Sequence, residues 1–212
     1  MLQRSLESRN GQLFIVWMFG TAIGWGVIVY PALTLRDQLL ASWSTLLGIA
    51  WHLFIPSLFL GLIVGTLQYF AMRSIMRISI RWIVFSTFGY ALGTPIAFLL
   101  SAAILGLTFP EIYTGNGNAF SAMPVDTTMF LCGGVLGLFQ ATELKKYFVM
   151  YRLRDTALWV LGSALGWGLG FFSIGYAWAI GLPVFMQSGV AGLVIGLVTG
   201  GILLLQLAQT RK

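Results

Sequence analysis

The stretch Trp159-Val-Leu-Gly-Ser-Ala-Leu-Gly-Trp167 decides the fold of this chain, because two earlier stretches repeat it. These are Trp82-Ile-Val-Phe-Ser-Thr-Phe-Gly-Tyr90 and Trp17-Met-Phe-Gly-Thr-Ala-Ile-Gly-Trp25. In each copy a Trp is followed after four, seven and eight residues by Ser or Thr, by Gly, and by Trp or Tyr. Self-similarity of this kind predicts repeated copies of one structural unit.

The composition indicates a membrane protein. Of 212 residues, 58% are hydrophobic and only 8% are charged, and the mean hydropathy is +0.88. Soluble domains carry about 25% charged residues. The length accommodates six membrane spans of about 20 residues each. We therefore expect an all-α fold. Residues 1–212 should form a single transmembrane domain with six transmembrane helices.

The spans pair into three helical hairpins, at about residues 13–72, 82–144 and 157–207. With the N-terminus inside, eleven of the twelve Lys and Arg residues face the cytoplasm and only Arg36 lies outside. The positive-inside rule therefore predicts that both termini are cytoplasmic. We attribute the net charge of +6 to the basic residues that mark the cytoplasmic side, and not to a nucleic-acid binding site.

The second span of each hairpin carries a different pattern. Gly61-Leu-Ile-Val-Gly-Thr-Leu-Gln68 and Gly133-Gly-Val-Leu-Gly-Leu-Phe-Gln140 are each followed, five residues after Gln, by a basic residue. The last span keeps Gln206 before Arg211, but its glycines fall out of register in that alignment. Three repeats of the same orientation indicate a pseudo-threefold ring about an axis along the membrane normal. An irregular bundle would satisfy the same pattern.

Glycines spaced four residues apart occur in every span. This spacing lets helix backbones approach closely in lipid and predicts packing seams between helices, the alternative being a narrow permeation path. The residues are Gly20/Gly24, Gly61/Gly65, Gly89/Gly93, Gly133/Gly137, Gly162/Gly166/Gly170 and Gly192/Gly196/Gly200.

The repeated polar residues fall in one layer of the cytoplasmic half. Each Gln precedes an interfacial basic residue by about 7.5 Å of helix rise, and each hydroxyl follows an interfacial Trp by about 6 Å. The layer is interpreted either as hydrogen bonding between helices, or as a polar binding site on the axis. Its members are Thr21, Gln68, Ser86, Gln140, Ser163 and Gln206.

The sequence lacks the signals of known chemistry. The middle of each apolar run is free of charged residues, which disfavours an ion-coupled pump. His52 is the only histidine and Cys132 the only cysteine, so a metal site is not expected. Hydrolase and phosphate-loop motifs are absent. We expect no catalytic, metal-binding or cofactor-binding residues, and the pattern names no cofactor.

The Gly-x-x-x-Gly-x-x-Gln and Trp-x-x-x-Ser-x-x-Gly-Trp patterns together resemble six-span membrane proteins of cyanobacteria and related bacteria. The resemblance covers nearly all of the chain between Trp17 and Arg211 and brings no established activity. It implies a multi-pass protein of a bacterial plasma or thylakoid membrane.

Two functions remain open at this point. The first is a non-enzymatic accessory or assembly subunit that binds lipids or other membrane proteins. The second is a small-solute transporter or substrate-binding subunit with its site at the polar layer. A cavity at that layer would favour transport, whereas a packed axis would favour the accessory role.

Overall fold

The computed structural model describes residues 2–34, 46–73, 76, 78–108, 125–147 and 153–209. Within the helices, the side chains of residues 2–8, 28–34, 46–52, 102, 105–108 and 125–127 lie outside this description. The regular structure of the described part is helical throughout. The helices are α1 (Leu2–Thr34), α3 (Leu46–Arg73), α4 (Arg81–Thr108), α6 (Val125–Leu144), α7 (Leu153–Ala179) and α8 (Val184–Gln209).

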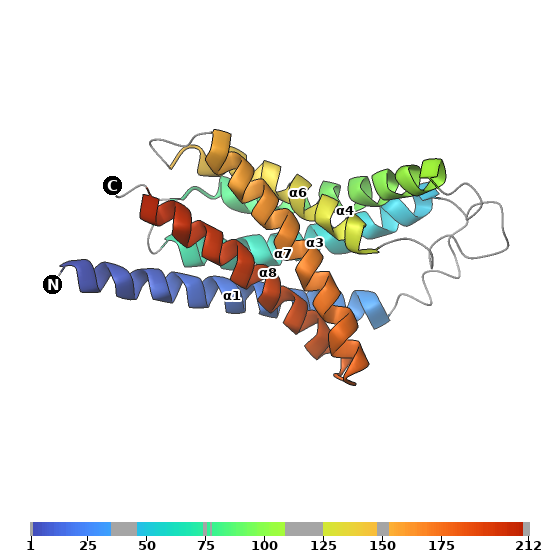
Figure 1. Cartoon of the computed structure of the whole chain (residues 1–212), viewed down its shortest axis with the longest axis horizontal. Helices are drawn as coiled ribbons and strands as arrows, with labels where there is room; N and C mark the ends of the chain where they lie inside the picture. Colours follow the sequence, from blue (N-terminus) through green and yellow to red (C-terminus); the bar gives the residue numbers. More distant parts are fainter. Residues whose placement is uncertain are drawn as a thin grey trace.

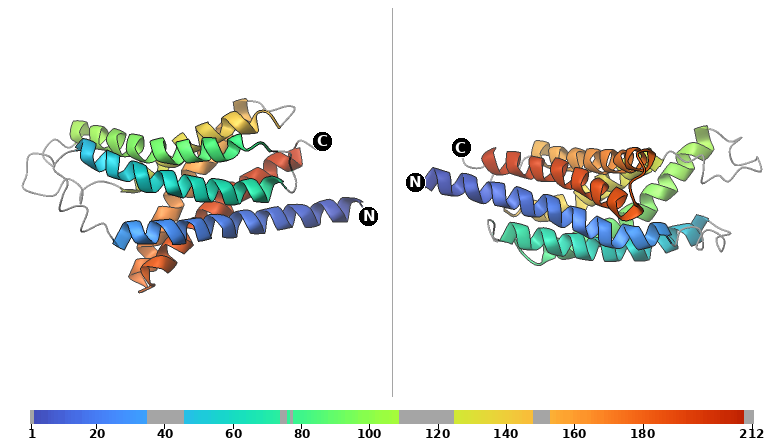
Figure 2. Two further views of the ribbon diagram at one scale, coloured as in Figure 1. Left: turned by 180° about the vertical axis from the view of Figure 1, so that it is seen from behind. Right: turned by 90° about the horizontal axis from the view of Figure 1, so that it is seen from below.

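The helices form a closed ring. Each helix packs against the next one along the chain, and α8 returns to pack against α1. Both termini lie at one end of the bundle, which we call the terminal end (Figure 1). The end of α3, the start of α4, the end of α6 and the start of α7 lie at this end too, and the α7–α8 turn lies at the opposite end (Figure 2).

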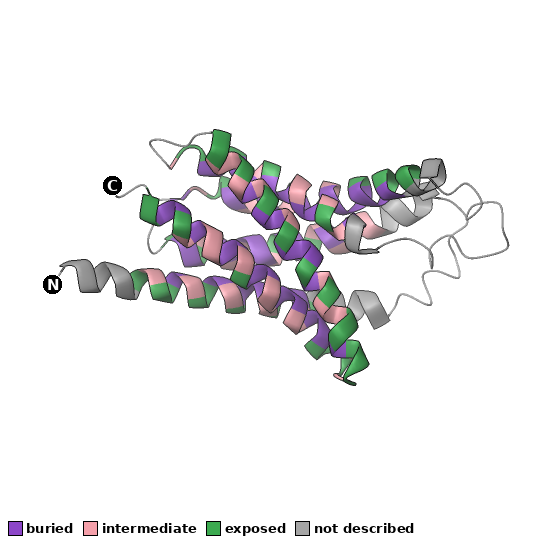
Figure 3. Cartoon of the chain, in the orientation of Figure 1, coloured by how far each residue is buried: buried purple, intermediate pink, exposed green. Residues whose placement is uncertain are grey.

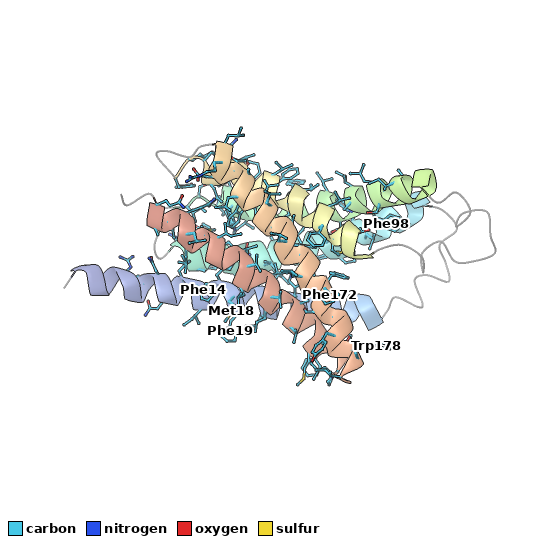
Figure 4. The ribbon with its side chains drawn as sticks, in the orientation of Figure 1. Phe14, Met18, Phe19, Phe98, Phe172 and Trp178 are labelled. Carbon is cyan, nitrogen blue, oxygen red and sulfur yellow. The ribbon has the colours of Figure 1, made fainter. Side chains whose placement is uncertain are left out.

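The outer faces of the helices are apolar. Burial follows the inward faces, and exposed residues line the outside of the ring (Figure 3). On α7, for example, Leu161, Leu165 and Leu169 recur every four residues and are all exposed. Phe172 continues this outward face, and Trp178 is exposed near the α7–α8 turn (Figure 4). A water-soluble bundle would place polar residues at such positions.

Among the described residues, α3, α4, α7 and α8 contain stretches long and apolar enough to cross a membrane, and α6 contributes the shorter apolar segment Thr128–Leu144. The chain is therefore a multi-pass membrane protein. The helices extend past the expected spans at most ends. In particular α1 starts at Leu2, eleven residues before the expected start of its hairpin at residue 13.

The glycines lie where helices touch, as their spacing predicted. A Cβ added at Gly65 would lie 2.8 Å from the Cβ of Ser86 on α4, and one at Gly137 would lie 2.9 Å from the Cα of Val160 on α7. For each of the fourteen predicted glycines, an added Cβ would meet a neighbouring helix within 3.4 Å. The packing-seam prediction is confirmed by these contacts. At six of the positions the added Cβ would lie within 3.0 Å of a backbone atom of the neighbouring helix, namely at Gly61, Gly133, Gly137, Gly170, Gly192 and Gly196.

The α7–α8 turn is short because Gly181 ends α7. Gly181 has φ of 76°, in the left-handed region that residues with a Cβ rarely adopt. The amide of Leu182 donates to the carbonyl of Ala177 at 3.0 Å, and that of Gly181 to the carbonyl of Trp178 at 2.9 Å. This pair of bonds is a Schellman cap, and Pro183 directly precedes the return helix α8.

Candidate functional site

Three tryptophans from three helices meet inside the ring. Trp17 on α1, Trp82 on α4 and Trp159 on α7 have ring centroids 5.9, 6.1 and 6.2 Å apart. Each of these side chains is at most 1% exposed. We call this group the tryptophan triad, and it closes the centre of the ring toward the terminal end.

A second aromatic cluster lies eight residues further along the same helices. The ring of Trp167 lies 5.0 Å from that of Trp25 and 5.0 Å from that of Tyr90, measured between centroids. All three side chains are buried. We call Trp25, Tyr90 and Trp167 the upper aromatic cluster. It fills the centre of the ring about 12 Å of helix rise from the tryptophan triad, on the side away from the terminal end.

The spacing of the repeated motif explains this arrangement. Residues four and eight positions apart lie on one face of an α-helix. The Trp, the hydroxyl residue and the second aromatic residue of each copy therefore face inward together. Thr21, Ser86 and Ser163 are buried between the two aromatic layers.

Two glutamines extend into this hydroxyl layer. Gln68 Nε2 donates to the Thr21 hydroxyl at 3.3 Å. Gln140 Nε2 donates to the Ser86 hydroxyl at 3.0 Å and lies 3.5 Å from Gln68 Oε1. The structure thus brings four of the six predicted residues into one buried network, with each glutamine bonded to the hydroxyl of its own hairpin.

Ser163 lies in the same layer, but its hydroxyl has no hydrogen-bond partner among the described residues. The indole N–H groups of Trp82 and Trp159 are likewise buried and unpaired there. The Trp17 indole differs, because it donates to the Thr199 hydroxyl at 3.0 Å. The network is therefore complete on two sides of the ring and incomplete on the third.

The contacts of the glycines explain the third side. An added Cβ at Gly61, Gly133 or Gly192 would meet the backbone oxygen of Ser86, Ser163 or Thr21, respectively. These three glycines therefore occupy equivalent positions. Seven residues further along, the equivalent residues are Gln68, Gln140 and Thr199.

Gln206 consequently lies about two helical turns from the position that its alignment with Gln68 implied. The structure places its amide beside the start of α7, where Nε2 donates to the backbone oxygen of Asp155 at 2.8 Å. Gln206 ties the end of α8 to the start of α7, and Thr199 replaces it in the layer.

A buried carboxylate also lies near the network and was missed by the sequence argument. Glu143 is fully buried one turn beyond Gln140 on α6. Its Oε1 accepts from the Ser79 hydroxyl at 2.5 Å and from the Tyr147 hydroxyl at 2.9 Å, and its Oε2 pairs with Lys146. Lys146 and Tyr147 follow at three and four residues, a helical pairing that could have identified this group.

The hydrogen bonds around Glu143 indicate that its role is structural. The Ser79 hydroxyl accepts from the backbone N–H of Arg81 at 3.3 Å, so Ser79 caps the N-terminus of α4. The Ser79 amide in turn donates to the Tyr147 hydroxyl at 2.7 Å. Glu143 therefore holds the start of α4 against the end of α6 at the terminal end of the bundle.

The axis offers neutral hydrogen-bonding groups between aromatic rings. Within the described part of the chain there is no group of three His, Cys, Asp or Glu residues that could hold a metal ion. No protein-family model, curated protein or solved structure matches this chain. The class that fold and site define is a multi-pass helical membrane protein with an aromatic-lined polar layer at its centre.

Proposed function

We propose that this chain is a non-enzymatic accessory or assembly subunit that binds other membrane proteins or lipids on its outer surface. The observation that carries the proposal is the closed axis. The tryptophan triad and the upper aromatic cluster lie on either side of the hydroxyl layer, and rings 5.0–6.2 Å apart leave little room for a solute between them.

The proposed topology has six spans arranged as three parallel hairpins, with both termini in the cytoplasm. Equivalent contacts in the three hairpins support this topology. In each hairpin, a glycine on the second helix contacts the first helix of the next hairpin. Exposed Arg73, Arg81, Lys145 and Arg154 lie at the terminal end, as the positive-inside rule requires of a cytoplasmic end.

The outer faces are the surface on which partners would bind. Exposed aromatic residues are concentrated on the second half of α7, where Phe172, Tyr176 and Trp178 are each about two thirds or more exposed. Aromatic residues are enriched at protein interfaces and at the borders of membranes. This half of α7 therefore suits contact with a neighbouring membrane protein.

Tagged purification in mild detergent tests the proposal. We expect the parent chain to carry one or more membrane proteins in fixed stoichiometry. Phe172→Ala on α7 should weaken that association, whereas Phe19→Ala, 50% exposed on the α1 face, is a matched control. Recovery of the chain without any partner protein would count against the proposal.

The alternative is a small-solute transporter or substrate-binding subunit. The specific observation in its favour is that three buried polar groups at the layer have no hydrogen-bond partner among the described residues. They are the hydroxyl of Ser163 and the indole N–H groups of Trp82 and Trp159. Buried groups left unpaired cost free energy, so a bound solute could stabilise them. Co-purification of a small molecule that is lost on Ser163→Ala would support this alternative.

A further inference from the structure

One patch at the terminal end differs from the rest of the basic rim. Among the described residues, Arg154 lies 3.8 Å from the Asp155 carboxylate and bonds Gln209, and Arg73 stacks on the Tyr69 ring. Arg81 and Lys145 are exposed and have no carboxylate partner in the same part of the chain. Their charges are therefore available to an external anion.

Arg81 is the first residue of α4 and Lys145 directly follows the last residue of α6, and these two helix ends are held together. The Ser79–Glu143 and Ser79–Tyr147 bonds hold the start of α4 beside the end of α6. Lys146 reaches across to α4, with Nζ 5.8 Å from the centroid of the Phe85 ring. Because Lys146 neutralises the buried Glu143, the outward charge of this corner stays positive.

Exposed apolar side chains lie deeper along both helices. Val84 and Phe88 on α4 are 47% and 49% exposed, and Leu138 on α6 is 54% exposed. Phe88 lies seven residues from Arg81 and Leu138 seven residues from Lys145, so both apolar residues lie about 10 Å deeper than the charges. Headgroup depth and acyl-chain depth in one leaflet differ by a similar distance.

We propose that the α4/α6 corner is a binding site for an anionic phospholipid. Arg81 and Lys145 bind the headgroup phosphate, and the acyl chain lies on Val84, Phe88 and Leu138. Basic residues at a membrane surface favour anionic lipid, and an apolar wall beside them retains the chain. The site deepens the proposed lipid-binding function and rests on its membrane orientation.

The test uses the purified full chain in non-ionic detergent with added phosphatidylglycerol or phosphatidylcholine, and native mass spectrometry counts the lipids retained. We expect phosphatidylglycerol to be retained in preference to phosphatidylcholine. Arg81→Gln combined with Lys145→Gln should lower phosphatidylglycerol affinity by about thirtyfold. Arg154→Gln removes a charge at the same end outside the corner and should leave the affinity within about twofold of the parent.

Equal retention of the two lipids, or equal losses in the double variant and in Arg154→Gln, would overturn the proposal. Melting temperatures in lipid-free detergent show whether each variant folds. If the double variant unfolds, Leu138→Asp supplies a second test, since it obstructs the acyl-chain surface without touching the basic residues. Partner capture by the tagged chain is measured separately, so loss of lipid selectivity is distinguishable from absence of a protein partner.

Discussion

The Trp17 indole nitrogen donates to the Thr199 hydroxyl at 3.0 Å, although 182 positions separate the two residues in the sequence. Trp17 lies on α1 and Thr199 on α8, so this bond joins the first and last helices where the ring closes. Trp82 and Trp159, the equivalent tryptophans, have no such acceptor among the described residues. The bond between α1 and α8 therefore exists because the third hairpin has Thr199 where the other two hairpins have Gln68 and Gln140.

Removing this hydroxyl should weaken ring closure. Thr199→Val keeps the shape of the side chain but leaves the Trp17 N–H buried without an acceptor. We expect a loss of about 1 kcal/mol in the free energy of unfolding, measured by thermal or denaturant unfolding in detergent. Thr142→Val is the control, because Thr142 is exposed and bonds only the carbonyl of Phe139. Identical melting of Thr199→Val and the parent would contradict the prediction.

Filling a helix contact should be costly only where the glycine faces a neighbour. Gly65→Leu and Gly137→Leu place a side chain against the atoms of Ser86 and Val160, and overpacking of this kind costs about 1–3 kcal/mol. Gly201→Leu on α8 is the matched control, since an added Cβ there meets nothing within 4 Å. If all three variants melt alike, the seams do not limit stability.

The polar layer can be tested through its glutamines. Gln140→Leu removes the bonds to Ser86 and Gln68, and hydrogen bonds in membrane proteins average about 0.6 kcal/mol, so we expect a stability loss of about 1 kcal/mol. Gln206→Leu removes only the bond to the Asp155 carbonyl and should leave the layer unchanged. A Gln140→Leu chain that keeps its stability but loses a bound small molecule would instead support the transporter alternative.

Glu143 should matter as a hydrogen-bond acceptor. Glu143→Ala leaves Ser79 and Tyr147 without their acceptor and loosens the start of α4, at a cost of about 1–3 kcal/mol. Glu143→Gln retains an oxygen acceptor and should cost less, although it loses the ion pair with Lys146. Unfolding curves of the two variants, compared in one detergent, measure the difference. Equal losses would show that the charge, not the hydrogen bonds, dominates.

Cysteine labelling tests the proposed topology. Cysteines at Ser74 and Tyr151 should react only with reagents that reach the cytoplasm, and one at Asn116 only from the outside. These three positions lie outside the described residues, and the native Cys132 is buried, which limits background labelling. Labelling of Asn116 from the cytoplasmic side would rule out the three-hairpin arrangement.

The sequence by itself determined the class of protein and most of its packing surfaces. A charge content of 8% leaves long segments that are stable as helices only away from water, and this property is local to each segment. Glycines four residues apart share a helix face whatever surrounds them, so their role as contact positions could be predicted from spacing alone. The same periodicity puts the Trp, the hydroxyl residue and the second aromatic residue of each motif on one helix face. The expectation that Trp17, Trp82 and Trp159 lie at the membrane interface was wrong, because all three are buried against one another inside the ring.

Only the tertiary structure decided which residue completes the polar layer and how the start of α4 is held against the end of α6. Alignment by residue type paired Gln206 with Gln68, whereas the contacts of Gly192 make Thr199 the equivalent residue. Glu143 also gained its role only by meeting Ser79, 64 positions away. Helical periodicity fixes the face on which a residue lies. The axial register between two helices depends on the side chains and glycines that interlock between them, and those contacts exist only after the helices have packed.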